Sequence, residues 1–436
     1  MMSDYALTNC RIIDGINSGY KENMTMLVEH GTIKQIGKSS EVKVPAGYTI
    51  LDITDKYVMP GLINAHVHLF GSGKPMKALS GGKSQKRIAR MINTKIGRKI
   101  LNQMVKKHAL TAFNSGVTTI RAVGDLLYSD IRLRDLIDSE KIQGPRLIVS
   151  GPAISVTGGH GAGSFAHISD SPWEARKFVR KNVSEQVDFI KICVTGGVID
   201  SRMVGQAGRL EMTLEEVSAV CEEAHKMGFL VAAHAESTEG VRTALLGGAD
   251  TIEHGSVLDQ KMIELFLDNP KSLRGYSSLI PTLYPAVTIC KLKPEDTLMN
   301  SVNVENAKIV FEGMAKGLVQ ATEAGILTGL GTDSSCPFVT QYNTWRELDY
   351  TVKYAGMSPE AAIHNATRHN AKILGIDHLT GTLELGKASD MIVIKNNPLT
   401  DLRALSEVDM VMRGELLIDN PKIAKLSQVD KLLNDI

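Results

Sequence analysis

Two histidines close the stretch VMPGLINAHVHLF, residues 58–70: His66 and His68. The apolar run before them is typical of a buried strand, in which side chains two residues apart point to the same face. Two imidazole nitrogens directed at one point supply half of a metal site. A pair of polar residues at the start of a loop is the alternative, because one such pair alone decides little. Further ligands from the rest of the chain must therefore be found.

Four more side chains that can bind a metal lie in or directly after apolar stretches that we predict to be strands. They are Lys191 in VDFIKICVTGG, His234 in FLVAAHAES, His254 in ADTIEHGS and Asp333 in ILTGLGTDSS. Each has an ordinary alternative: a core histidine, a lysine that reaches solvent, or an aspartate that begins a turn. A lysine in so apolar a strand is costly to bury unless it is paired or chemically modified. Because these residues recur at the same end of several strands, the joint pattern favours a metal site.

The sequence between residues 58 and 379 predicts the elements that position these side chains. Apolar, β-rich runs alternate there with amphipathic helical segments, as in parallel βα units. Helical segments 171–186 and 213–228 each open with a residue that can cap a helix. Eight strands close a (β/α)8 TIM barrel, whose active site lies at the carboxyl ends of the strands. The eight predicted strands are Leu62–His66, Val117–Val123, Arg146–Ser150, Phe189–Val194, Leu230–Ala233, Thr251–Glu253, Leu279–Leu283 and Leu327–Leu330.

The two ends of the chain predict a second, smaller unit. Residues 1–57 and 380–436 contain short β-rich runs separated by turn residues, without a long helical period. We expect the two ends to pair into one composite β-sandwich domain, with residues 58–379 forming the barrel.

Composition excludes several classes of function. With 43% hydrophobic and 22% charged residues, the composition is that of a globular protein. A chain of 436 residues is too long for a single ordinary core, so it predicts a large barrel or two domains. A net charge of +1 predicts neither a nucleic-acid nor a membrane partner. Five scattered cysteines without a CxxC motif argue against a disulfide framework and a thiolate zinc cage. No secretory signal is visible, so we expect a cytoplasmic location. We also expect a small-molecule substrate and a homo-oligomer.

The order of the candidate ligands resembles that of the amidohydrolase superfamily: HxH on the first strand, Lys on the fourth, His on the fifth and sixth, and Asp on the eighth. The stretches VMPGLINAHVH and GTLELGKASDMIVI are similar to the junctions between barrel and β-sandwich in that superfamily. TGGHG, DFIKICVTGG, TIEHGS and SPEAAIHNATRHNAKILGI most resemble the Xaa-Pro dipeptidase (prolidase-like) and imidazolonepropionase-related group. Lys191 favours the dipeptidase side, because imidazolonepropionase-type members generally bind one metal and lack this lysine.

The resemblance implies a binuclear metal centre. One divalent ion would be bound by His66, His68 and Asp333, and a second by His234 and His254. Lys191, carboxylated on its ε-nitrogen, would bridge the two ions. Imidazole ligands suit Zn²⁺.

The implied reaction is hydrolysis of an amide or peptide C–N bond. A hydroxide that bridges the metals would be the nucleophile, and Asp333 would pass its proton to the leaving nitrogen. His160, in the glycine-rich loop SVTGGHGAG after the third strand, would stabilise the oxyanion or contact the substrate. An ordinary loop role for His160 is an equal alternative.

One position departs from the pattern of the dipeptidase-like members. They commonly have a tyrosine two residues after the histidine of the fifth strand, where this chain has Glu236. A phenol can donate a hydrogen bond, whereas an ionised glutamate can only accept one. Glu236 would therefore bind a substrate amine or cation, or support a ligand, and Xaa-Pro cleavage itself is in question.

Other substrate-binding candidates lie in the predicted loops. Arg202 and Arg209, after the fourth strand, can clamp a carboxylate. Tyr284 follows the seventh strand. The basic loop 71–94 is either a lid or an ordinary solvated loop.

Three functions stay open. The first is a binuclear hydrolase of dipeptides such as Xaa-Pro or of N-acyl amino acids. The second is a cyclic amide hydrolase or a deaminase of the imidazolonepropionase type. The third, a non-catalytic scaffold, is disfavoured because the ligand set is complete.

Overall fold

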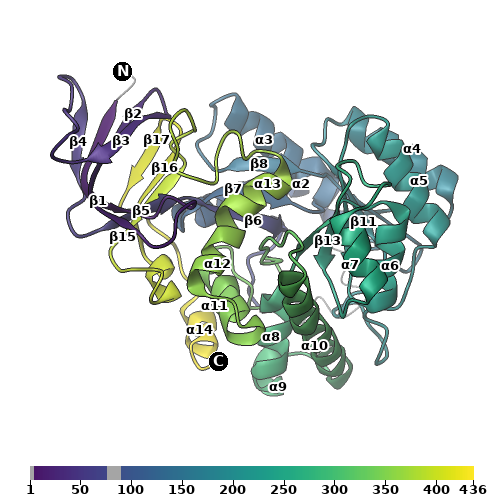
Figure 1. The fold of residues 1–436 in the computed structure, drawn as a ribbon. Helices are drawn as coiled ribbons and strands as arrows, with labels where there is room; N and C mark the ends of the chain where they lie inside the picture. Colours follow the sequence, from purple (N-terminus) through teal and green to yellow (C-terminus); the bar gives the residue numbers. More distant parts are fainter. Residues whose placement is uncertain (1–3, 76–89) are drawn as a thin grey trace.

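A computed structural model describes residues 4–75 and 90–436 of the chain, so most of the basic loop 71–94 lies outside the described residues. Figure 1 shows two units: a β-sheet at one side, coloured purple and yellow, and a larger assembly of strands and helices. The purple and yellow strands lie side by side, so strands from the N-terminal and C-terminal regions share this sheet. Within the described ranges, no helix is both long and apolar enough to cross a membrane.

The smaller unit is a mixed sheet in the order β17-β16-β15-β5-β1-β2-β3, with β4 paired to β1. Antiparallel pairing of β5 with β15, through Val58 and Val393, joins the two ends of the chain. Apolar side chains from both ends, such as Leu7 and Met412, share one core. The prediction of a small β-sandwich built from both termini is confirmed. Its strands are β1 Tyr5–Ile12, β2 Lys21–Glu29, β3 Thr32–Lys38, β4 Thr49–Asp52, β5 Tyr57–Pro60, β15 Met391–Ile394, β16 Val408–Arg413 and β17 Leu416–Asp419.

The larger unit is the predicted barrel of parallel strands. Seven predicted strands are present, and the third continues into β9, which pairs with β11 through Ile154 and Ile192. Short β10 pairs with β9 outside the predicted set. The strands are β6 Leu62–Val67, β7 Val117–Ala122, β8 Arg146–Val149, β9 Ala153–Ser155, β10 Ala166–Ile168, β11 Ile190–Cys193, β12 Val231–Ala235, β13 Thr251–His254 and β14 Ser278–Ile280.

The eighth predicted strand is irregular, yet it closes the barrel. Residues 327–333 form backbone hydrogen bonds to β14, from Gly329 N–H to Leu279, and to β6, from Asp333 N–H to His66. Two side-chain amides take other backbone N–H groups of the segment: Asn370 accepts from Leu330, and Asn64 accepts from Thr332. Because these amides compete with the neighbouring strands, the segment keeps the course of a strand without its regular ladder.

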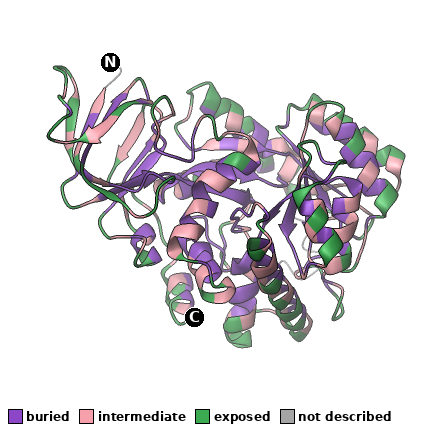
Figure 2. Ribbon diagram, viewed as in Figure 1, coloured by how far each residue is buried: buried purple, intermediate pink, exposed green. Residues whose placement is uncertain are grey.

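Helices surround the barrel and turn their exposed faces outward (Figure 2). Both predicted caps are present: Ser171 caps α4, and Thr213 forms a capping box with Glu216 at α5. The main helices are α2 Lys95–Asn114, α3 Ser129–Asp138, α4 Pro172–Ser184, α5 Leu214–His225, α6 Thr238–Gly247, α7 Gln260–Leu267, α8 Leu283–Lys291, α9 Pro294–Thr297, α10 Ser301–Glu323, α11 Thr344–Ala355, α12 Pro359–His364, α13 Asn370–Leu374 and α14 Ser427–Leu433.

The seventh predicted strand, Leu279–Leu283, ends earlier than expected. The structure has β14 end at Ile280 and α8 begin at Leu283. The buried carboxylate of Glu347 accepts the backbone N–H groups of Leu283 and Tyr284, each at 2.7 Å. These two hydrogen bonds satisfy N–H groups of the first helical turn and so favour the start of α8 at Leu283. The apolar run alone had predicted that the strand continues to this residue.

Gly331 allows the eighth segment to approach β6 closely. A Cβ atom at this position would lie 2.3 Å from the Cβ of His66, which is far inside van der Waals contact. We expect Gly331→Ala to force the two segments apart and lower the free energy of unfolding by roughly 1–3 kcal/mol. Denaturant unfolding of both proteins measures the change, and equal stability would contradict this account of barrel closure.

Candidate metal centre

The first two histidines lie at the carboxyl end of β6, with their rings 5.7 Å apart. The Nδ1 atom of His66 is 2.7 Å from a carboxylate oxygen of Glu253, and Nδ1 of His68 is 2.7 Å from the carbonyl oxygen of Gly124. An Nδ1–H group that donates to these oxygens leaves each Nε2 lone pair free. Burial, with the nearby charge of Lys191, lowers the pKa of His66 to about 4, so the neutral ring is favoured. Neutral imidazoles are the form that binds metals.

His234, in β12, and His254, in β13, face the same point as the histidines of β6. The ring of His254 is 4.5 Å from that of His234 and 4.8 Å from that of His66. Nδ1 of His254 contacts Thr282 Oγ1 at 2.7 Å, and Nε2 of His234 lies 3.4 Å from the carbonyl oxygen of Gly196. Each of the four rings therefore has one nitrogen held by a protein oxygen and one nitrogen left for a ligand, as in metal sites with ordered outer contacts.

Asp333 faces the two histidines of β6 and is a further candidate ligand. Its Oδ1 atom is 3.3 Å from Nε2 of His68 and 3.6 Å from Nε2 of His66. Atoms of His66, His254 and Asp333 that can bind a metal all lie within 4.8 Å of one another. Asp333 has a φ of 54° and His254 a φ of 69°, so both adopt the left-handed conformation that few side-chain-bearing residues adopt. This conformation turns the chain sharply at the strand ends where the donors gather.

Lys191 lies in β11 and is 2% exposed. Its Nζ atom is buried and has no hydrogen-bond partner. Burial lowers the pKa of Lys191 below its ordinary value, which favours the neutral amine. A neutral amine can react with carbon dioxide to form a carbamate, so this orphaned nitrogen fits the carboxylated lysine of a two-metal centre.

Arg121 and Glu253, which the sequence analysis did not select, hold His66 in place. The Arg121 guanidinium lies 2.7 and 2.8 Å from the two carboxylate oxygens of Glu253, and neither residue is more than 3% exposed. Burial alone would raise the pKa of Glu253. The charge of Arg121 and the hydrogen bond from His66 outweigh burial and hold this pKa well below its usual range. Both residues lie in short strands that also contain threonine, so their sequence signal is weaker than that of Lys191 in its apolar strand.

His160 lies beside His234, one of the candidate ligands. Its ring stacks on that of His234, with centroids 4.3 Å apart, and its Nδ1 atom is 2.8 Å from a carboxylate oxygen of Asp200. Burial alone would lower the pKa of His160. The hydrogen bond to Asp200 and the charge of that carboxylate outweigh burial, so the pKa of His160 is raised. The sequence analysis also missed Asp200, because nothing in its loop predicted this contact.

Glu236 follows β12 and faces the centre. Its carboxylate lies close to the rings of His234 and His254: candidate ligand atoms of the three residues are within 4.8 Å of one another. The Oε2 atom of Glu236 is buried and has no hydrogen-bond partner. Burial raises the pKa of Glu236 to about 8.

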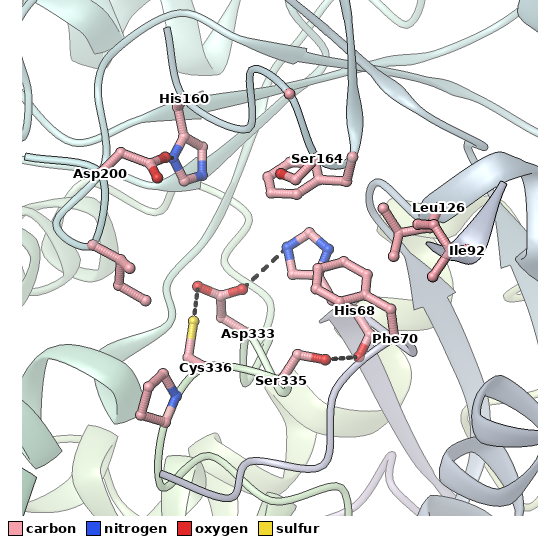
Figure 3. Close-up of a pocket in the computed structure, with 14 residues that line it drawn as sticks. His68, Phe70, Ile92, Leu126, His160, Ser164, Asp200, Asp333, Ser335 and Cys336 are labelled. Atoms are coloured by element: carbon pink, nitrogen blue, oxygen red, sulfur yellow. Dashed lines mark hydrogen bonds and ion pairs between the residues drawn. The ribbon is translucent and has the colours of Figure 1, made fainter. Parts of the chain in front are cut away.

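A cavity opens in front of these groups (Figure 3). One part has an apolar wall that includes Phe70, Leu126 and Phe165, and the rings of Phe70 and Phe165 stack at 5.9 Å. A second part is lined by apolar side chains from α8 and α10, including Pro285 and Met314. His160, Ile199, Asp333 and Cys336 line both parts. The polar centre therefore lies between two apolar spaces.

Three predicted substrate residues do not line either part of this cavity. Arg202 is exposed, and Arg209, which is also exposed, lies 3.5 Å from Glu211. Tyr284 is fully buried in an apolar cluster, where its ring packs against Tyr350. The early start of α8 carries Tyr284 into that cluster and away from the strand ends.

Comparison with known proteins places this arrangement in a family. The chain is similar to a structure described as a putative prolidase from Bifidobacterium longum, with 43% identity, a TM-score of 0.88, and coverage of 100% of this chain and 99% of the other. A structure of a Xaa-Pro dipeptidase with methionine bound in its active site is 30% identical, with a TM-score of 0.82 and coverage of 96% and 100%. The ochratoxinase of Aspergillus niger is 25% identical over 92% of this chain and 84% of its own length. The model of the amidohydrolase family matches residues 57–417, and the chain therefore belongs to that family.

Proposed function

We propose that this chain is a binuclear metal-dependent hydrolase that cleaves the amide bond of a dipeptide, such as Xaa-Pro, or of an N-acyl amino acid. The observation that carries the proposal is the set of four imidazoles around Asp333, each with one nitrogen held and the other free. The similarity to proteins described as prolidases supports the choice of substrate class.

The two ions would be held by the residues that converge at the strand ends. His66, His68 and Asp333 would bind one ion, His234 and His254 the other, and a carboxylated Lys191 both. Zn²⁺ suits these donors. When bound, such ions polarise a carbonyl and make a water molecule acidic near neutral pH.

Asp333 is positioned to move the proton that amide hydrolysis requires. Its carboxylate lines the cavity and faces His66 and His68. It would accept a proton from the attacking water and deliver it to the leaving nitrogen, which must be protonated before it departs.

His160 would bind the substrate carbonyl oxygen. Asp200 holds its Nδ1 atom, so the ring orientation is fixed and the remaining nitrogen is available to the cavity. An imidazole that donates a hydrogen bond there stabilises the oxygen as it becomes negative.

The cavity supports a substrate with apolar groups on both sides of the scissile bond. The wall of Phe70, Leu126 and Phe165 would hold one side chain, and the space beside Pro285 and Met314 the other. A screen of dipeptides and N-acyl amino acids on the zinc-loaded protein, with cyclic amides as the comparison set, tests this proposal. Turnover of cyclic amides alone would favour the imidazolonepropionase-type alternative.

We expect Asp333→Asn to retain most of the metal and to lose about 10²- to 10⁴-fold in kcat, because the isosteric amide cannot carry the proton. Metal content and steady-state kinetics measure the two effects separately. Near-normal turnover would mean that Asp333 is a structural residue.

Lys191→Ala should remove at least one ion and nearly all activity, because the bridging group is lost. Short carboxylic acids such as acetate or propionate should restore part of both by filling the vacated space. Elemental analysis and kinetics with and without propionate provide the readouts, and a crystal structure should show three extra atoms on Lys191 Nζ. Full activity in the alanine variant contradicts the bridge.

Glu253→Gln should weaken metal binding by about 10- to 100-fold, since the group that orients His66 is altered. It should also destabilise the fold by about 3–5 kcal/mol, because the buried charge of Arg121 loses its partner. The double variant Arg121→Met/Glu253→Gln should recover part of the stability without restoring the metal affinity. Additive stability losses would show that the two residues do not act as a pair.

A further inference from the structure

We propose that Glu236 is a third protein ligand of the second metal ion, together with His234 and His254. This inference rests on the proposed function, since it requires that a second ion is bound. It assigns Glu236 to the metal and not to the substrate amine or cation that the sequence first suggested.

The backbone places Glu236 on the same side of its strand as His234. The two residues are two positions apart at the end of β12, so their side chains point to one face, as do those of His66 and His68 at β6. A hydrogen bond of 3.1 Å from the Glu236 N–H to Thr195 Oγ1 holds the backbone there. His254 reaches the same point from β13, and one of its ring nitrogens is among the atoms grouped within 4.8 Å.

The carboxylate lacks the partners that a buried anion requires. Its Oε2 atom is shielded from solvent and receives no hydrogen bond. Within residues 4–75 and 90–436, no cationic side chain forms an ion pair with Glu236. A buried carboxylate oxygen without a partner is unfavourable, and a divalent ion held by the two neighbouring imidazoles would supply the missing positive charge.

Contact with a substrate amine explains this placement less well. An amine-binding carboxylate needs only to face the cavity, whereas a carboxylate oxygen of Glu236 also lies within 4.8 Å of a ring nitrogen on each of two imidazoles. Each of these imidazoles has one nitrogen in contact with a protein oxygen. Three donors from two adjacent strands converge on one point. Convergence of this kind is what a coordinated ion requires.

A carboxylate ligand would also change which metal the second site accepts. Carboxylates suit harder ions such as Mn²⁺, whereas a site of imidazoles suits Zn²⁺. We expect the second site to hold Mn²⁺ more tightly, relative to Zn²⁺, in the wild-type protein than in a variant without this carboxylate.

Glu236→Gln and Glu236→Ala test the assignment in the full-length chain. Metal per chain is measured by elemental analysis after equilibration at buffered concentrations of free Zn²⁺ or Mn²⁺, and the rise in Tm on adding each metal is an independent readout. The first ion should bind both variants as it binds the wild type. The second ion should bind at least about tenfold more weakly, because loss of a direct ligand should cost no less than loss of an outer contact.

Glu216→Gln is the matched control. It makes the same chemical change at a mostly buried carboxylate that caps α5 and does not line the cavity. Since glutamine can also complete a capping box, folding and both metal affinities should be unchanged.

The two failures are distinguishable. Two ions in the wild type, with a second-site affinity within about twofold in both Glu236 variants, overturn this inference alone. In that case a raised KM for dipeptides with a free amino group, but not for N-acyl amino acids, would assign Glu236 to the substrate. A wild-type chain that takes up no ion would overturn the proposed function as well.

Discussion

The buried pair of Arg121 and Glu253 is the interaction on which the geometry of the candidate metal centre depends. It links three strands of the barrel: Arg121 in β7 donates to the Ala65 carbonyl oxygen in β6 and to Thr251 in β13, while Glu253 in β13 contacts His66. Two charges removed from water are tolerated only when each is fully paired, and here every contact also fixes the register between strands. The orientation of His66 therefore follows from the pairing of Arg121 with Glu253 inside the barrel.

The strand ends convert this rigid interior into a reactive site. Both His254 and Asp333 have a left-handed backbone conformation, which turns the chain sharply where the candidate ligands gather. Gly331 permits the close approach of the eighth segment that brings Asp333 to the histidines of β6. Loops add His160 and Asp200 on one side of the cavity, and the helices α8 and α10 add apolar side chains on the other.

The sequence predicts those parts of the site that depend on local geometry. His66 and His68 follow from the alternation of a strand, and Lys191 from a lone charge in an apolar run. Arg121 and Glu253 carry a weaker signal, because their strands also contain polar residues. Their role depends on the register of three strands distant in sequence, which no local pattern contains. Tyr284 was misplaced for a related reason: Glu347, far along the chain, accepts its N–H and starts a helix. The irregular eighth segment likewise depends on the amides of Asn64 and Asn370.

Charge balance connects the proposed ligands to the substrate. Two divalent ions would bring four positive charges into a site that is largely shielded from water. Asp333 and a carboxylated Lys191 would offset two of them, while the four histidines, neutral when they bind metal, would offset none. A further anion in direct contact with the second ion would relieve the remaining excess, and Glu236 is a carboxylate whose buried oxygen has no other partner. The residual positive charge would then stabilise the negative oxygen that develops when an amide carbonyl is attacked, so the charge balance that would retain the metals would also favour the transition state.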